Sequence, residues 1–508
     1  MKVGGFRLSY LPPLMVYVAF GIQGLTAIVG GFFVKDYLDL SAAFLAALAF
    51  WAGIPWALKM PVGHLVDLIW RWKALLVWLG AAMLAASLFI MIGLIEHLDA
   101  MREVMSAERW FVLAALLTPT GYMIQDAVAD AMTVEAVPRV DERGQPLPEA
   151  ARKEMHTTMQ TLGRVAVIGG LAAVSLANVY VFHGTDALPK EQKLALYAMI
   201  YKVALLIPVL SVAGVILHHF VRHERAPVEK TQPNWWVLGG SLVFAAVTLA
   251  IGVGKVPYAQ ELVFAASLAI ILFLLWRLAR ELSPEARETL VATALVIFIY
   301  RAMPSVGPGY SWWTIDILKF DEAFLSKLSL VAYGLTLAGM FTLRRYMART
   351  AIPAIIVMLT VVGTLLTLPN IGMLYGFHEW TASVTGGVVD ARVIALIDTA
   401  LESPLGQIAM IPMLAWIANS APANLKATYF AVMASFSNLA LSAAQLGTKY
   451  MNQLYTVSRE VKDRATGAVK ATQDYSQLPE LLIVVTLIGL VVPLLAVVAV
   501  KAMKLRTA

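Results

Sequence analysis

The chain has 508 residues, of which 59% are hydrophobic and 14% are charged, and its formal net charge is +6. Soluble proteins carry about 25% charged residues, so this composition excludes an ordinary soluble domain and predicts an integral membrane protein. The chain has no cysteine, which excludes disulfides and thiolate metal sites. Its eight histidines lack the spacing of metal ligands, so we expect neither a metal nor another cofactor.

Apolar runs recur along the whole chain, and about 20 apolar residues are enough for one bilayer crossing. Six crossings are expected in the first half, over 10–34, 42–61, 74–95, 110–135, 155–182 and 195–220. Two compact spans follow, over 235–254 and 260–279. Six more are expected over 290–308, 324–343, 351–375, 391–418, 427–450 and 479–502. The first run is interpreted as an uncleaved helix rather than a signal peptide.

Lysine and arginine gather in alternate breaks between these fourteen spans, apart from the long segment 451–478. Because cytoplasmic loops are enriched in positive charge, both termini are expected on the cytoplasmic side. The membrane is expected to be a bacterial inner membrane. Paired six-helix halves are typical of major facilitator transporters, which hold substrate near the middle of the bilayer. We therefore expect an all-α polytopic membrane protein with this fold, as a monomer. Its parts are an N-terminal bundle over 1–220, a linker with two extra helices over 221–289 and a C-terminal bundle over 290–508.

The loop after the second span, "PVGHLVDLIWRWK", carries Gly63, Asp67, Arg71 and Lys73. It resembles the loop signature of major facilitator transporters, in which glycine allows close helix approach and the charged residues lock the cytoplasmic side. Leu68 departs from that signature, which places a basic residue after the aspartate. We expect these residues and Glu135 to form a cytoplasmic gate, and an ordinary charged loop is the alternative.

The fourth span contains "TGYMIQDAVADAMTVE", with Asp126 and Asp130 one helical turn apart on the same face. A carboxylate facing lipid is costly, so this face should point into the bundle or into a wet cavity. Both aspartates are candidate proton-coupling residues. Tyr122 lies near the middle of the span and is a candidate substrate contact.

The fifth span places His156, Gln160 and Arg164 in a single polar stripe. Arg164 lies near mid-depth, so a pairing with Asp126 is sterically reasonable. Such a pair has two interpretations: a structural ion pair that only holds the helices together, or a proton-sensitive pair linked to substrate. Gln160 and Arg164 are therefore candidate substrate contacts.

The second half carries charges of its own inside expected spans. "YRAMPSVGPGY" sets Arg301 before Pro304, Gly307, Pro308 and Gly309, which predicts an interrupted helix. Asp398 and Glu402 repeat the four-residue acidic spacing. Asn438 and Gln445 in the penultimate span suit either helix packing or substrate binding. Arg164 and Arg301 are the candidate partners of an anionic solute, because guanidinium binds carboxylates bidentately and stays charged.

Several of these stretches resemble the folate–biopterin transporter family of the major facilitator superfamily. The similarity runs through "GIPWALKMPVGHLVD", "DAVADAMTVE", "YRAMPSVGPG" and the region from Gly406 to Asn438. Members of that family import reduced folates, pterins or related anionic metabolites, commonly with protons. The resemblance therefore implies a small anionic solute and protons as partners, taken up by alternating access. "QDAVADAMTVE" also looks like the matching motif of muropeptide permeases, so a muropeptide or another anionic solute stays open.

Other classes fit the sequence less well. A non-transporting assembly or pigment-delivery protein on the same fold would need no polar path through the molecule. A membrane enzyme is not expected, because no nucleophile, base or metal-ligand set is visible. A channel is disfavoured by two dissimilar halves without a repeated ring of pore-lining charges.

Overall fold

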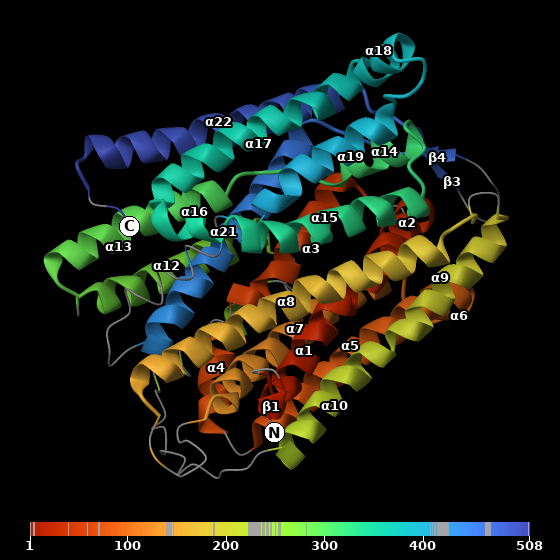
Figure 1. The fold of residues 1–508 in the computed structure, drawn as a ribbon. Helices are drawn as coiled ribbons and strands as arrows, with labels where there is room; N and C mark the ends of the chain where they lie inside the picture. The colour runs from red at the N-terminus through yellow and green to blue at the C-terminus, as the bar shows by residue number, and fades with distance from the viewer. Residues whose placement is uncertain are drawn as a thin grey trace. The chain divides into compact units, whose positions relative to one another are not determined.

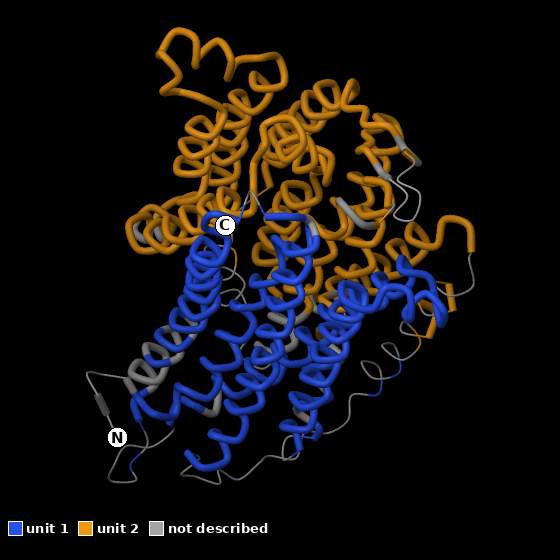
Figure 2. The backbone as a smooth tube through the Cα atoms, turned by 90° about the vertical axis from the view of Figure 1, so that its right-hand side faces the viewer, with its two compact units in different colours: residues 1–31, 61–241 blue, residues 32–60, 242–508 orange. Residues whose placement is uncertain are grey.

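The computed structural model of the chain is almost entirely helical and divides into two compact units (Figure 2). The first comprises residues 1–31 and 61–241, and the second comprises 32–60 and 242–508. The structure describes the backbone outside 1, 4–5, 39, 58, 70–71, 139–144, 146, 186–187, most of 222–255, 281, 407, 409, 411–412, 414–425, 463–468, 506 and 508, and leaves out some further side chains within helices.

The first unit begins with a short hairpin and continues as helices. Its elements are β1 (Lys2–Val3), β2 (Phe6–Arg7), the 3-10 turn η1 (Leu8–Tyr10), α1 (Leu11–Ile22), the 3-10 turn η2 (Gln23–Thr26), the start of α2 (Ala27–Tyr37), α4 (Lys59–Leu68), α5 (Lys73–Glu96), α6 (Leu98–Val104), α7 (Ala107–Ala136), α8 (Glu149–Val181), α9 (Lys190–Ala204) and α10 (Leu206–Val221). The run expected over 10–34 therefore contains the 3-10 turn η2, and the run over 195–220 contains the junction of α9 and α10.

The second unit takes the end of α2 and the whole of α3 (Ala42–Ala57). Its other helices are α12 (Ala259–Ala279), α13 (Pro284–Arg301), α14 (Pro308–Asp316), α15 (Glu322–Thr342), α16 (Arg344–Arg349), α17 (Ile352–Leu374), α18 (Phe377–Val384), α19 (Ala391–Glu402), the 3-10 turn η4 (Ser403–Leu405), α21 (Lys426–Leu454) and α22 (Leu478–Ala502). A hairpin of β3 (Val461–Lys462) and β4 (Val469–Ala471) precedes α22. The helices are labelled in Figure 1.

Nine segments of the described chain are long and apolar enough to cross a membrane. They are Leu8–Lys35, Lys73–Glu96, Ala107–Thr133, Thr161–Val181, Glu191–Val221, Ala259–Arg277, Glu322–Thr342, Ile352–Leu374 and Leu478–Ala502. Ala42–Trp56 is a shorter apolar helix. The span expected over 235–254 lies largely outside the described residues. In the span expected over 391–418, α19 ends at Glu402 and η4 follows, and most of the residues after Gly406 lie outside the described part of the chain.

Glycine contacts set the helix spacing in the first unit. A Cβ atom added to Gly80 of α5 would lie 2.6 Å from the Gly121 carbonyl oxygen of α7. One added to Gly21 of α1 would lie 3.0 Å from the Cα atom of Gly170 on α8. Membrane helices gain their association energy from such close backbone packing, since lipid is as apolar as their side chains. These glycines therefore set how closely α5 approaches α7 and how closely α1 approaches α8.

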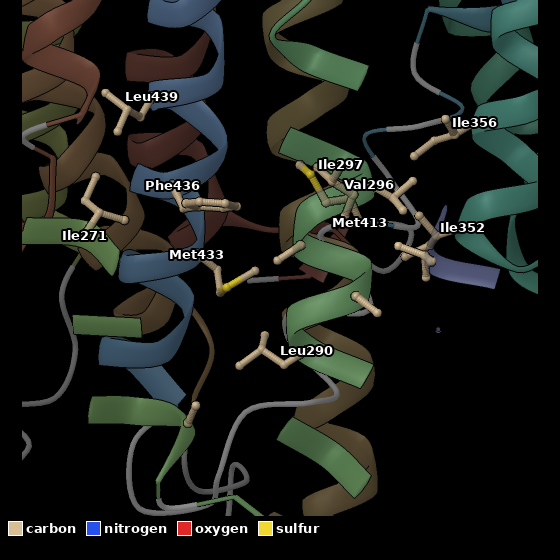
Figure 3. Packing of buried hydrophobic residues seen from close by; sticks show 14 residues of the cluster. Ile271, Leu290, Val296, Ile297, Ile352, Ile356, Met413, Met433, Phe436 and Leu439 are labelled. Carbon is tan, nitrogen blue, oxygen red and sulfur yellow. The ribbon is translucent and has the colours of Figure 1, made fainter. Parts of the chain in front are cut away.

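An apolar cluster of the second unit joins α12, α13, α17 and α21 (Figure 3). Phe436 and Leu439 of α21 belong to the same buried cluster as Ile297 of α13 and Ile356 of α17. α3 runs along α21, and Asn438 donates to the Trp56 carbonyl oxygen at 3.3 Å. This packing explains why residues 32–60 group with the second unit.

Candidate functional site

A polar cluster in the first unit centres on Tyr17 of α1. Its hydroxyl donates to Asp130 Oδ1 of α7 at 2.6 Å, and the charges of Asp126 and Arg164 also act on this hydroxyl. Tyr17 is only 7% exposed. The structure thus brings three residues singled out from the sequence to one buried phenol, and a direct Asp126–Arg164 pair stays a prediction.

The position of Tyr17 is fixed by a glycine beside Arg164. A Cβ atom added to Gly163 of α8 would lie 2.9 Å from Tyr17 Cε2, so only glycine leaves room for the ring. Tyr17 could not be singled out from the sequence, because a tyrosine in an apolar span has no periodic signal of its own. The feature of the sequence that could have pointed to Tyr17 is the Gly163–Arg164 pair, because a glycine beside a charge inside a span leaves space for a side chain from another helix.

Tyr122 and Gln125 lie on the same helix but have packing roles. Tyr122 is 4% exposed and meets the ring of Phe20 edge-on, with ring centroids 5.3 Å apart. Gln125 donates to the Val77 carbonyl oxygen at 3.2 Å and to Ser211 Oγ at 3.0 Å. Both residues therefore stabilise the bundle in this conformation, and a substrate contact by Tyr122 stays a prediction.

The expected gate residues are only partly described. Lys73 is buried at the start of α5, and a Cβ atom added to Gly63 would meet nothing within 4 Å. Of the other gate residues, Arg71 and the side chains of Asp67 and Glu135 lie outside the described residues. The side chain of Gln160, a candidate substrate contact, also lies outside them.

Arg301 ends α13 in the second unit and is half-buried. Its Nε donates to the Ser437 carbonyl oxygen at 3.2 Å, and its Nη1 lies 3.7 Å from Met410 Sδ. The guanidinium lines a cavity of about 10 Å³ whose other walls are largely apolar. That volume admits about one water molecule, so Arg301 is held by protein atoms in this conformation.

The expected interrupted helix is confirmed. α13 stops at Arg301, α14 starts at Pro308, and Gly307 between them has a φ of 73°, which glycine adopts without strain. Two side chains of α21 form hydrogen bonds with the non-helical backbone between α13 and α14. Thr448 Oγ1 accepts from the Ser305 N–H at 2.9 Å, and Asn452 Nδ2 donates to the Val306 carbonyl oxygen at 3.2 Å.

A second polar cluster links three helices of the second unit. Tyr310 of α14 donates to Asn370 Oδ1 of α17 at 2.9 Å, and Asn370 Nδ2 donates to Asp398 Oδ2 of α19 at 2.7 Å. Asp398 Oδ1 is buried and has no hydrogen-bond partner within the described part of the chain. The acidic spacing drew attention to Asp398, whereas Asn370 gave no signal because its partners lie on other helices.

Asn438 and Gln445, both on α21, are half-buried. The hydrogen bond from Asn438 to Trp56 holds α21 to α3, which is the packing alternative raised from the sequence.

A third polar cluster surrounds Asp316, at the end of α14. Lys35 Nζ lies 2.5 Å from Asp316 Oδ1, and Tyr475 donates to Asp316 Oδ2 at 2.6 Å. Nearby, Arg459 is 3% exposed, donates to the Leu38 carbonyl oxygen and stacks over the Trp312 ring. These contacts join the end of α2 to the segment that precedes α22.

Comparison with known proteins identifies the family. The model of the BT1 family matches residues 20–505, which is nearly the whole chain. The chain belongs to the BT1 family. The folate-biopterin transporter of Synechocystis sp. is 23% identical over 431 residues, covering 84% of this chain and 71% of that protein.

Solved structures of transporters share the fold. A POT family transporter in complex with 5-aminolevulinic acid matches with a TM-score of 0.66 and 12% identity, over 99% of this chain and 98% of that one. The nucleoside transporter NupG matches with a TM-score of 0.53 and 15% identity, over 98% of this chain and 100% of that one. This BT1 family protein therefore has the expected major facilitator fold and is an integral membrane transporter of a small solute, not an enzyme.

Proposed function

We propose that this transporter takes up folate- or pterin-like anionic metabolites together with protons, by alternating access. The observation that carries the proposal is the cluster of Tyr17, Asp126, Asp130 and Arg164 in the first unit. Intramembrane ionisable side chains are costly and are characteristic of substrate paths and proton relays. The Synechocystis relative supports the substrate class, because its name is that of a folate-biopterin transporter.

The coupling follows from charge balance around Arg164. A proton taken up by Asp126 or Asp130 removes a negative charge near the guanidinium. Arg164 then has more positive potential to offer the carboxylate of an anionic solute, for which it has suitable bidentate geometry. Proton and anion thus favour each other's binding, which is what uptake driven by a proton gradient requires.

Uptake into liposomes that contain the purified protein tests this proposal. A labelled reduced folate and a labelled pterin should accumulate faster when an inward proton gradient is imposed. Asp126→Asn and Asp130→Asn should abolish that acceleration, because an amide binds no proton in this range. Glu96→Gln is the matched control, since Glu96 forms an exposed pair with Lys202 in the same unit.

Unchanged gradient dependence in both aspartate variants would contradict the coupling. Uptake of a muropeptide without uptake of folate or pterin would contradict the substrate class.

A further inference from the structure

A polar cavity of about 340 Å³ lies in the second unit at the start of α12. Its walls come from three helices far apart in the sequence: α3, α12 and α21. Its lining includes Tyr258, Gln260, Glu261, Lys449 and Tyr450. The transport site proposed above uses none of them.

One ion pair forms the charged wall of this cavity. Lys449 Nζ donates to Glu261 Oε1 at 2.7 Å, and the Tyr450 hydroxyl donates to the same oxygen at 2.5 Å. Lys449 Nζ also lies 4.9 Å from the centre of the Tyr450 ring. One oxygen of the carboxylate therefore has two donors.

Two buried acceptors beside this pair lack donors. Glu261 Oε2 has no hydrogen-bond partner among the described residues, and the same holds for Gln260 Oε1. Gln260 is 7% exposed, and its amide nitrogen is held by the Ala47 carbonyl oxygen at 3.0 Å. A buried acceptor without a donor is destabilising, so each of these oxygens favours a ligand group that only donates. An ammonium group has three donors and no acceptor.

Charge balance narrows the ligand further. Lys449 neutralises Glu261, so a simple cation would bind Glu261 against repulsion from Lys449. A zwitterion avoids this repulsion, because its anionic group binds Lys449 while its ammonium group binds the two unpartnered oxygens. The cavity therefore suits a compact zwitterion that carries an ammonium group and an anionic group such as a phosphate.

The position of the cavity points to the bilayer as the source. The apolar span of α12 begins at Ala259 and α21 ends at Leu454, so the cavity lies at an end of both helices. Tyr258 is 72% exposed and Tyr450 38% exposed. Tyrosine and tryptophan gather at the level of lipid headgroups.

We propose that this cavity binds the zwitterionic phosphoethanolamine group, as the headgroup of a membrane lipid. Its ammonium donates to Glu261 Oε2 and Gln260 Oε1, and its phosphate accepts from Lys449. The bound headgroup completes the contact between the inserted helix α12 and helix α21.

Thermal unfolding of the purified full chain in detergent tests this proposal, with three lipids of identical acyl chains added in turn. Phosphatidylethanolamine should raise the apparent Tm by several degrees more than phosphatidylcholine, whose nitrogen has no N–H, or phosphatidylglycerol, which has no cation. Glu261→Gln and Lys449→Gln should remove this difference. Glu96→Gln, which breaks the Glu96–Lys202 pair in the first unit, should retain it.

Soluble O-phosphoethanolamine distinguishes the source of the ligand. If O-phosphoethanolamine at millimolar concentration raises Tm without added lipid, the site accepts the free zwitterion. If only phosphatidylethanolamine raises Tm, the site binds the headgroup only as part of a membrane lipid. Equal Tm values in all three lipids without an effect of O-phosphoethanolamine would overturn the proposal. So would a phosphatidylethanolamine effect that persists in both cavity variants.

A second measurement applies if the variants do not fold. Native mass spectrometry of the unaltered protein, given equal amounts of phosphatidylethanolamine and phosphatidylcholine, should show preferential retention of the former. Equal retention would overturn the proposal.

Discussion

Asn370 on α17 donates its amide to Asp398 on α19 at 2.7 Å, while its carbonyl oxygen accepts from Tyr310 on α14 at 2.9 Å. One side chain thus holds a carboxylate and a phenol on two other helices. An amide suits this position because it donates and accepts at once. Through Asn370, α14, which is the second part of the interrupted helix, is linked to α19.

Removing this link should reveal coupling between the two residues. Asn370→Ala and Asp398→Ala should each lower stability, and the double variant should lose about 1 kcal/mol less than the sum, as for hydrogen bonds between membrane helices. Apparent unfolding free energies in a mild detergent would measure this. Thr364→Ala, whose hydroxyl bonds within α17, should be additive with Asp398→Ala. Additivity of the Asn370 and Asp398 variants would show that their hydrogen bond contributes nothing measurable.

Gly163→Ala should impair transport without changing any charge. The added methyl group would meet the Tyr17 ring at 2.9 Å and displace its hydroxyl from Asp130. We expect at least a tenfold fall in the rate of gradient-driven uptake, corresponding to about 1.4 kcal/mol. Gly169→Ala on the same helix is the matched control, because nothing lies within 4 Å of its added Cβ atom. An equal fall in both variants would assign the effect to α8 as a whole.

Gly80→Ala should destabilise the first unit. Its methyl group would lie 2.6 Å from a backbone oxygen of Gly121, which cannot move without separating α5 from α7. Overpacking of this kind costs about 1–3 kcal/mol. Gly363→Ala on α17 meets nothing within 4 Å and should be neutral or stabilising, because alanine favours helix. Thermal unfolding of the two variants side by side measures the difference, and equal midpoints would contradict the prediction.

Tyr475→Phe should lower stability by about 1–2 kcal/mol, because it leaves Asp316 without one hydrogen-bond donor. Burial, and then the hydrogen bond to Asp316, raise the pKa of Tyr475 above its usual range. The phenol therefore stays protonated in the folded state, and its contribution is present below the ordinary tyrosine pKa and lost only at more alkaline pH. The loss of stability should be constant from about pH 6 to pH 9. A loss that varied across this range would mean that another group controls the contact, and Tyr455→Phe is the control.

Asp67→Asn tests the expected cytoplasmic gate. If Asp67 stabilises the closed cytoplasmic side, the variant should label faster at cysteines introduced on that side. The chain has no cysteine of its own, so single cysteines can be introduced directly. Unaltered labelling rates would remove Asp67 from the gate.

The sequence by itself determined the features that depend on neighbouring residues along the chain. Hydropathy marks the spans because each helix must bury its own apolar length in lipid. Helical periodicity puts Asp126 and Asp130 on one face. Pro304, Gly307 and Pro308 end α13 after Arg301 because proline and glycine act on the local backbone.

The tertiary structure alone decided which side chains meet. Tyr17 reaches Asp130 only because Gly163 leaves space for its ring. Lys449 meets Glu261 across a separation of 188 residues, which no local pattern encodes. Such contacts depend on the rotation and spacing of whole helices, and those are set by close glycine packing and by buried hydrogen bonds that form only when the helices are in place.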